Sequence, residues 1–168
     1  SMEEYIDAKR NIFRYQGQND KLVLNYDNSI TKSFANEAKG KAVYFSRCRK
    51  IDSGAVLENG KLFYKTSDKS LEIVSADEIV IPGEHNVENY LAAIAAVIGH
   101  VKPETIKQVA TTFKGVEHRI ELAREARGIK FYNDSIGTSP SRTMAGLKSF
   151  KQKVILIAGG YDKNIPYD

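Results

Sequence analysis

The stretch that decides the fold is residues 128–163, which read GIKFYNDSIGTSPSRTMAGLKSFKQKVILIAGGYDK. An apolar run, a polar loop, a helix start at Ser139-Pro140, a second apolar run and a second loop follow one another, in the order of a βαβ unit. The two loops, residues 133–139 and 159–163, each come directly after a predicted strand. Ligands of open α/β sheets bind at the carboxyl ends of the strands. The stretch therefore predicts an α/β protein with a ligand site at these loops.

The composition is that of a globular chain, with 168 residues of which 42% are hydrophobic and 27% are charged. No apolar run approaches the ~18 residues that span a bilayer, and the first residues lack a signal-peptide pattern. We therefore expect a cytoplasmic protein with no membrane partner. The net charge of +4 is spread along the chain without a recognised nucleic-acid module, so no nucleic-acid partner is expected. The single cysteine, Cys48, is expected to be a small buried side chain.

The first 50 residues alternate between helix and strand patterns. Apolar residues recur at helical spacing over residues 2–15, and Lys9 falls inside that stripe. A strand at 22–26, a helix at about 29–38 and a strand at 42–46 then indicate a parallel sheet. Because a buried ammonium is costly, Lys9 either reaches water, meets an anionic group or is chemically altered.

Residues 54–66 predict a β-hairpin, because two β-rich runs flank Asn59-Gly60, the pair that favours a type I′ turn. The segment resembles a phosphate-binding loop but lacks its spacing, and Leu62 stands where Ser or Thr would bind Mg²⁺. Further short strands are predicted at 71–74 and 78–81.

The remainder of the chain contains two helices, a hinge and a hairpin. We expect helices at about 86–98 and 103–113, a hinge at 114–116, and a hairpin formed by 120–126 and 129–132. We place a domain boundary at 115–116. Both ends look cut within a domain, so the chain is interpreted as a fragment.

Several polar residues are candidates for binding, each with a structural alternative. Asn86 and Asn89 share one face of a helix start and either cap it or contact a polar ligand. Asp134 ends a strand, where it either binds ribose hydroxyls or enters a helix. Lys163 follows two glycines and either binds an anion or lies exposed in a loop.

Five short segments, in a fixed order along the chain, resemble the Mur ligases: YIDAK at 5–9, GEHNVEN at 83–89, GVEHR at 115–119, YNDSIGTSP at 132–140 and GGYDK at 159–163. The resemblance covers essentially the whole chain, and the fourth and fifth segments favour the D-glutamate-adding branch of the family. It implies that residues 1–115 are the later part of a Mur-type central ATPase domain, with a mostly parallel sheet and a small antiparallel hairpin region. Residues 116–168 would begin a Rossmann-like C-terminal domain that binds D-glutamate.

The resemblance also implies an activity, which is the ATP- and Mg²⁺-dependent addition of D-glutamate to UDP-N-acetylmuramoyl-L-alanine in peptidoglycan synthesis. In this family ATP converts the substrate carboxylate into an acyl phosphate, which the incoming amino group attacks. The complete enzyme would act as a monomer.

Functional residues carry over position by position. Lys9 matches a carbamylated lysine that supports Mg²⁺, Asn86 and Asn89 match asparagines beside the nucleotide, and His118 and Arg119 match a pair that enters the site on domain closure. Arg119 would stabilise phosphate charge.

Three further positions belong to the loops of the opening stretch. Asp134 matches the ribose-binding aspartate, while Thr138 and Lys163 match positions that hold the side-chain carboxylate of D-glutamate. Ile136 stands where some relatives have a lysine.

Other functions stay open from the sequence. The chain has no counterpart of the family's phosphate loop, so we expect these 168 residues alone to be inactive. A different Mur-type ligase, such as a folylpolyglutamate synthetase, and a nucleotide-binding module without catalysis are the alternatives.

Overall fold

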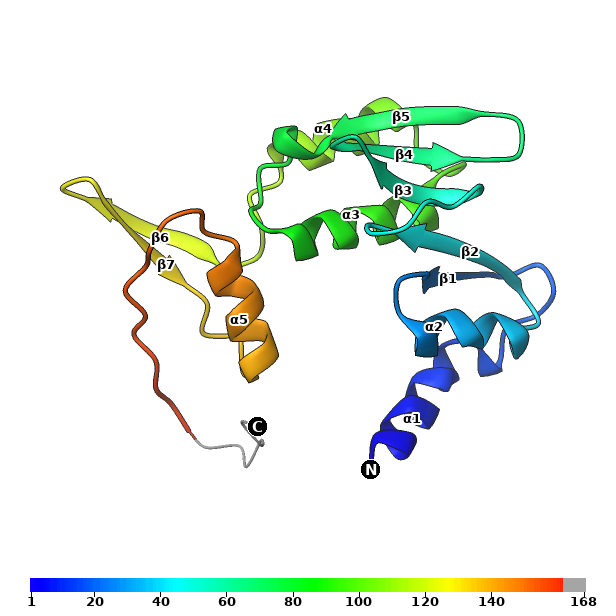
Figure 1. Ribbon diagram of the computed structural model, residues 1–168, viewed down its shortest axis with the longest axis horizontal. Helices are drawn as coiled ribbons and strands as arrows, with labels where there is room; N and C mark the ends of the chain where they lie inside the picture. The colour runs from blue at the N-terminus through cyan, green and yellow to red at the C-terminus, as the bar shows by residue number, and fades with distance from the viewer. Residues whose placement is uncertain (162–168) are drawn as a thin grey trace. The chain divides into compact units, whose positions relative to one another are not determined.

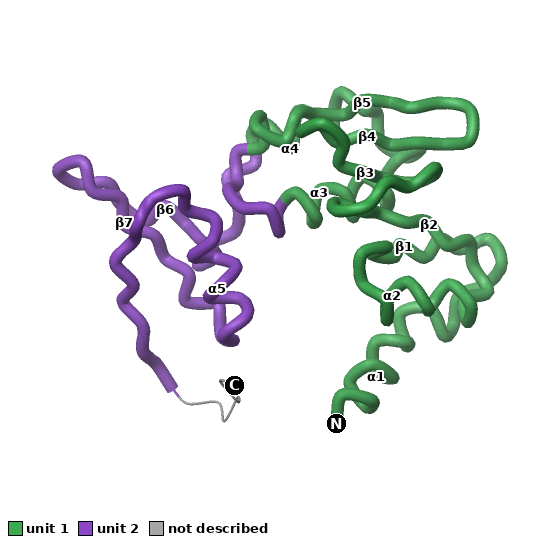
Figure 2. The backbone as a smooth tube through the Cα atoms, in the orientation of Figure 1, with its two compact units in different colours: residues 1–79, 87–112 green, residues 80–86, 113–168 purple. Residues whose placement is uncertain are grey.

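The computed structural model describes residues 1–161 (Figure 1). The chain divides into two compact units, which are coloured separately in Figure 2. Unit 1 consists of residues 1–79 and 87–112, and unit 2 consists of residues 80–86 and 113–168. The α/β class that the sequence predicts is confirmed, because strands and helices alternate along the chain.

Helix α1 (Met2–Arg14) opens unit 1, with Ser1 as its N-cap. Its Phe13 joins a small core with residues of β1 (Lys21–Asn25) and of the turn η1 (Phe34–Asn36), which follows the short helix α2 (Ser29–Ser33). The rings of Phe13 and Phe34 lie 5.2 Å apart. Only part of the predicted apolar stripe is covered, because Met2 and Ile12 are exposed.

A five-stranded sheet forms the centre of unit 1, in the order β1-β2-β3-β4-β5. Strand β2 (Lys41–Ser46) pairs in parallel with β1 and with β3 (Gly54–Glu58). Strands β4 (Lys61–Lys65) and β5 (Ser70–Ser75) continue the sheet with antiparallel pairing. The parallel sheet and the adjoining antiparallel hairpin are thus both present, as predicted.

The turn between β3 and β4 is the one predicted from Asn59-Gly60. Both residues have positive φ angles, 49° and 76° respectively, as a type I′ turn requires. The resemblance to a phosphate-binding loop was therefore correctly rejected, since residues 54–65 form a hairpin.

Two helices complete unit 1. Helix α3 (Glu84–Val97) buries Leu91, Ile94 and Ala95 completely, and α4 (Pro103–Thr112) packs against β5. The three side chains recur at helical spacing and make one fully buried face. The apolar character of α3 predicted this burial.

Unit 2 contains a two-stranded ribbon and one helix. Strands β6 (Glu121–Ala126) and β7 (Ile129–Asn133) pair antiparallel, and α5 (Pro140–Lys148) follows with Pro140 at its start. The ring of Tyr132 meets that of Phe150 edge-to-face at 4.8 Å, which connects the ribbon to the segment after α5.

Three predictions are wrong for the described residues. Residues 154–158 form no strand, so the opening stretch is not a βαβ unit here. A strand requires a hydrogen-bonded neighbour, and within residues 1–161 β7 pairs with β6 alone. Residues 76–78 form the turn η2 (Ala76–Glu78) instead of entering a strand at 78–81, because Ser75 and Glu78 cap each other. Cys48 is exposed rather than buried.

Candidate functional site

Residues 133–137, which comprise the last residue of β7 and the loop after it, are the centre of the candidate site, and we call them the strand-exit loop. Asp134 accepts a hydrogen bond at Oδ1 from the backbone N–H of Ile120 (3.2 Å). Its Oδ2 lies against two glycines, where an added Cβ on Gly137 or Gly146 would be 2.9 or 3.1 Å away. The predicted ribose-binding carboxylate thus has a structural partner inside unit 2.

The segment that Asp134 contacts is the turn at residues 118–121, which leads into β6. His118 and Ile120 have φ angles of 64° and 48°. The left-handed region is uncommon for any residue other than glycine and costs roughly 1–2 kcal/mol per residue. For the β-branched Ile120 it is a clear outlier, so this turn depends on the bonds that hold it.

Hydrogen bonds from the strand-exit loop supply that restraint. The carbonyl of His118 accepts from the N–H of Ile136 (3.3 Å), and the ring Nδ1 of His118 lies 2.8 Å from Nδ2 of Asn133. The N–H of His118 donates to the carboxylate of Glu121 (2.8 Å). The 118–121 turn and the strand-exit loop therefore form one hydrogen-bonded assembly.

The structure brings three predicted residues together in this assembly, namely His118, Arg119 and Asp134. Arg119 is exposed, and its backbone N–H donates to the carbonyl of Val116 (3.2 Å). Thr138 is exposed directly after the strand-exit loop. Lys163 lies outside the described residues.

The predicted nucleotide asparagines lie in the first turns of α3. Asn86 donates from Nδ2 to the carbonyl of Pro82 (2.6 Å), so its amide ties the helix start to the preceding segment. This contact is not the predicted cap, because the helix begins two residues earlier, at Glu84, and the amide donates to a carbonyl instead of accepting from a helix N–H. Asn89 is exposed.

Tyr90, beside Asn89, is 91% buried, and its hydroxyl has no hydrogen-bond partner among the described residues. Burial raises the pKa of this phenol above its usual value of 10.0.

Lys9 is exposed on α1, with its Nζ 5.0 Å from the centre of the Tyr5 ring. The ammonium of Lys9 therefore reaches water, as the first of the three alternatives for this lysine requires. Within residues 1–161 no group of three His, Cys, Asp or Glu side chains could hold a metal ion. Lys9 thus has space for a modification but no neighbouring cluster of metal ligands in the part of the chain that the structure describes.

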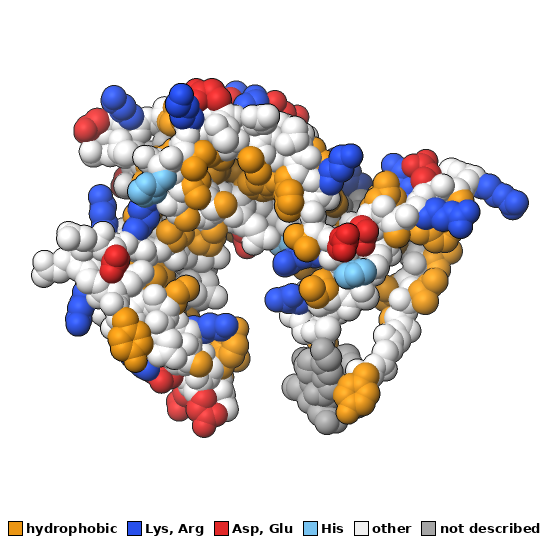
Figure 3. Space-filling model, turned by 180° about the vertical axis from the view of Figure 1, so that it is seen from behind, with side chains coloured by type: hydrophobic (Ala, Val, Ile, Leu, Met, Phe, Trp, Pro, Cys, Tyr) orange, Lys and Arg blue, Asp and Glu red, His pale blue; other side chains and the backbone are white. Residues whose placement is uncertain are grey.

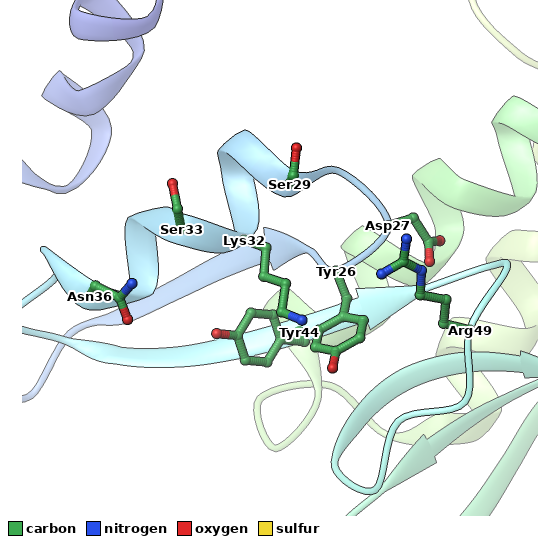
Figure 4. Close-up of a pocket in the computed structure, with 8 residues that line it drawn as sticks. All are labelled: Tyr26, Asp27, Ser29, Lys32, Ser33, Asn36, Tyr44 and Arg49. Atoms are coloured by element: carbon green, nitrogen blue, oxygen red, sulfur yellow. The ribbon is translucent and has the colours of Figure 1, made fainter.

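A separate groove of about 470 Å³ lies in unit 1, at the carboxyl ends of β1 and β2 (Figure 4). Its walls include Tyr26 and Tyr44, whose rings meet edge-to-face at 5.3 Å, and Lys32, whose Nζ lies 3.7 Å from the centre of the Tyr26 ring. None of the predicted site residues lines it.

Asp27, beside this groove, organises the loop after β2 and was missed in the sequence. Its carboxylate accepts hydrogen bonds from the hydroxyl of Ser46 (2.8 Å) and from the N–H groups of Arg47 (2.8 Å) and Cys48 (3.1 Å). An aspartate at the end of a predicted parallel strand is the signal that could have found it.

The residues that sequence reasoning missed in unit 2 are Asn133 and Glu121, both of which contact His118. Asn133 directly precedes Asp134 at the strand end, and asparagine there favours a local turn. Its Oδ1 accepts from the N–H of Ser135 (3.1 Å), which is that turn.

Charged side chains of both signs are interspersed on the face shown in Figure 3. The chain also contains ion pairs, such as Arg10 with Glu37 (2.9 Å), in which the hydrogen bond to Glu37 raises the pKa of the guanidinium. No helix among residues 1–161 is both long enough and apolar enough to cross a membrane.

Comparison with known proteins identifies the family. Residues 1–97 match the family model described as the Mur ligase middle domain. The chain is 64% identical over all of its residues to a UDP-N-acetylmuramoylalanine–D-glutamate ligase of Acetivibrio thermocellus, and 62% identical to one of Ruminiclostridium cellulolyticum. It spans 36% of the length of each of these relatives.

Solved structures agree at the level of the fold. A crystal structure of MurF from Acinetobacter baumannii superimposes with a TM-score of 0.71 at 19% identity, over 92% of this chain and 34% of that one. A pseudomurein peptide ligase type C from Methanothermus fervidus gives a TM-score of 0.60 at 23% identity, over 89% of this chain and 36% of that one. With the matched middle domain, these likenesses confirm the resemblance drawn from the five sequence segments: the chain belongs to the Mur ligase family.

Proposed function

We propose that the chain is part of an ATP-dependent ligase that joins D-glutamate to UDP-N-acetylmuramoyl-L-alanine in peptidoglycan synthesis. The observation that carries this proposal is the 64% identity, over every residue of the chain, to a relative named for that reaction. The substrate carboxylate would be phosphorylated by ATP, and the amino group of D-glutamate would displace the phosphate.

Four of the predicted residues would contact ATP in this proposal. Asn86 and Asn89 contact the nucleotide, Asp134 binds its ribose, and Arg119 stabilises the charge that develops on the transferred phosphate. An exposed guanidinium is suited to this role, because it stays charged and offers five donors in a planar fork.

The second substrate would be held by Thr138 and Lys163. A hydroxyl and an ammonium both donate hydrogen bonds, so together they suit the side-chain carboxylate of D-glutamate. Thr138 is exposed directly after the strand-exit loop, which leaves its hydroxyl accessible to a substrate.

The chain would contribute residues to two domains. We propose that residues 1–115 belong to the ATP-binding domain and residues 116–168 to the domain that binds D-glutamate. The start of the second compact unit at residue 113 lies close to this boundary and supports the assignment, whereas residues 80–86, which also belong to that unit, do not follow it.

The described residues offer a partner for ATP at Asp134 but only one candidate ligand for Mg²⁺, at Lys9. Oδ1 of Asp134 accepts a hydrogen bond from the N–H of Ile120, which leaves Oδ2 to accept a hydrogen bond from a ribose hydroxyl. Carbamylation of Lys9 would provide oxygen ligands, which a hard cation such as Mg²⁺ prefers. The described residues add no cluster of metal ligands beside Lys9.

The test is an assay of the complete gene product that contains this chain. Phosphate release is measured with ATP, UDP-N-acetylmuramoyl-L-alanine and D-glutamate, and then with L-glutamate or other amino acids in place of D-glutamate. Release that requires D-glutamate supports the proposal. Release driven equally well by a different amino acid, or none with any, rejects the substrate assignment.

A variant separates the two binding roles. Lys163→Ala is expected to raise the KM for D-glutamate far more than the KM for ATP, because the ammonium would contact only the amino acid. Lys148→Ala, at an exposed lysine in the last turn of α5, is the matched control and should change neither. Equal loss of both affinities in Lys163→Ala contradicts the assignment.

A further inference from the structure

We propose that Asn133 is a positioning residue that holds the imidazole of His118 in the Nε2–H tautomer, so that His118 meets an anionic oxygen as a hydrogen-bond donor. The inference concerns the strand-exit loop and the 118–121 turn, both of which lie within unit 2. Its use in catalysis rests on the proposed function, but the tautomer itself does not.

The orientation of the Asn133 amide is the first step. Its oxygen, Oδ1, accepts a hydrogen bond from the backbone N–H of Ser135 at 3.1 Å. A backbone N–H can only donate, so a flipped amide would place its NH₂ group against another donor. The Nδ2 group must therefore be the one that faces His118.

The tautomer of His118 follows from that orientation. Nδ2 of Asn133 lies 2.8 Å from Nδ1 of His118, and an amide NH₂ group donates without accepting. Nδ1 must then be unprotonated, because two donors cannot form a hydrogen bond with each other. In the neutral ring the proton is consequently on Nε2.

Glu121 is the competing partner of the ring. Its carboxylate lies 3.8 Å from Nδ1, beyond hydrogen-bond distance, and it accepts from the backbone N–H of His118 at 2.8 Å instead. The carboxylate therefore holds the backbone of His118, whereas Asn133 holds the ring.

The backbone of His118 is restrained on both sides, which makes the ring position specific. Its carbonyl accepts from Ile136, and the next turn residue, Ile120, donates to Asp134. The φ angle of 64° at His118 is unfavourable for a residue with a side chain, so these bonds offset a real cost. A turn held in this way keeps the imidazole within reach of Asn133.

The chemical consequence is that His118 presents an N–H donor. With Nδ1 occupied by Asn133, the exposed ring offers Nε2–H to its surroundings and cannot take a proton there. A phosphate or carboxylate oxygen is the type of group such a donor binds. His118 would then bind charge beside Arg119 rather than act as a general base.

The experiment reads the tautomer in the 168-residue chain by two-bond ¹H–¹⁵N correlation on uniformly ¹⁵N-labelled protein, at a pH where the ring is neutral. The variant His118→Gln identifies the signal among those of His85 and His100. We expect the Nε2–H pattern for His118, together with a scalar coupling across the hydrogen bond between Asn133 Nδ2 and His118 Nδ1.

Two variants make the assignment specific. Asn133→Asp keeps an acceptor for the N–H of Ser135 but removes the donor, so the proton should move to Nδ1 and face the new carboxylate. Ser135→Ala keeps its backbone N–H and should leave the His118 spectrum unchanged. Backbone amide spectra outside residues 116–137 establish that both variants fold.

An Nδ1–H pattern in the unaltered chain overturns the proposal, and so does an unchanged His118 signal in Asn133→Asp. Kinetics of the complete gene product then separate the two proposals. If Asn133→Asp switches the tautomer and lowers kcat while the KM for D-glutamate is kept, both stand. If the tautomer switches but kcat is unchanged, positioning by Asn133 stands and the role of His118 in the proposed reaction is lost.

Discussion

The hairpins β3–β4 and β6–β7 have the same local design but different surroundings. Each turns through two residues with positive φ angles, 49° and 76° at Asn59-Gly60 and 53° and 76° at Arg127-Gly128. In the first hairpin Leu62 is 0% exposed, whereas in the second Leu122 is 49% exposed. Turn chemistry is thus sufficient to make a hairpin, but it does not decide whether the hairpin is buried.

The difference in burial implies a difference in what stabilises each unit. Unit 1 buries fully the side chains of several strand and helix residues, including Val56, Leu62 and Leu91. In unit 2 the restraints we identify are mostly hydrogen bonds between the strand-exit loop and the 118–121 turn. We therefore expect unit 1 to respond most strongly to changes in its apolar core.

The largest expected effect comes from matched truncations of the two hairpins. Leu62→Ala should lower the free energy of unfolding by about 2–5 kcal/mol, because it leaves a cavity in a fully buried site. Leu122→Ala should cost less than about 1 kcal/mol, because half of that side chain is already in water. Urea denaturation followed by circular dichroism measures both, and similar losses would remove the distinction.

A second test removes a hydroxyl from each unit. Tyr90→Phe should raise the stability by about 1 kcal/mol, since it removes a buried hydroxyl that has no partner among the described residues. Tyr132→Phe, at a ring that is 40% exposed, should change little. Thermal denaturation compares the two variants, and a clear loss of stability in Tyr90→Phe would mean that its hydroxyl is hydrogen-bonded.

A third test exchanges the first turn residues of the hairpins. Arg127→Asn should stabilise the β6–β7 hairpin by up to about 1 kcal/mol, because asparagine tolerates a positive φ better than arginine. Asn59→Arg should have the opposite effect on the β3–β4 hairpin. Hydrogen exchange of the strand amides reports each change, and two effects of the same sign would contradict the shared turn geometry.

The smallest expected effect concerns the ion pair that connects η2 to α4. Lys107 lies 2.9 Å from the Glu78 carboxylate, and its hydrogen bond is the main cause that lowers the pKa of Glu78 below its ordinary value of 4.5. A lowered folded-state pKa adds stability above that ordinary value, which is lost as the pH falls through the folded pKa.

The measurement is the free energy of unfolding, from urea denaturation, as a function of pH. Glu78→Gln should reduce the loss of this free energy on acidification below pH 4.5 and should leave its pH dependence above pH 4.5 nearly unchanged. Lys107→Met is the matched control, because it removes the same pair from the other side. If both variants lose stability below pH 4.5 as the unaltered chain does, the exposed ion pair does not contribute to the free energy of unfolding.

The sequence predicted most elements of the fold, because their signals are local. The turn at Asn59-Gly60, the helix start at Ser139-Pro140 and the apolar face of α3 all depend on residues a few positions apart. The strand predicted at 154–158 was wrong, because a strand also needs a partner. Ile155 and Ile157 have a strand-like pattern, yet they are 95% and 93% exposed.

The sequence predicted which residues form the candidate site, but it did not predict the hydrogen bonds between them. The pattern singled out His118, Arg119 and Asp134, and unit 2 does bring them into one assembly. It could not show that Asp134 accepts from the N–H of Ile120, because that bond joins residues 14 positions apart. Asn133 was overlooked for the same reason.

The sequence by itself determined the family, the hairpin turns and the helix start at Ser139-Pro140, since each depends on residue identity and short-range spacing. Only the tertiary structure decided that Leu62 is buried while Leu122 is exposed, and that Asn133 rather than Glu121 holds the ring of His118. Burial and hydrogen-bond partners are set by groups that approach from distant parts of the chain. The local sequence pattern of a hairpin or a turn is the same whether or not groups from distant parts of the chain pack against it.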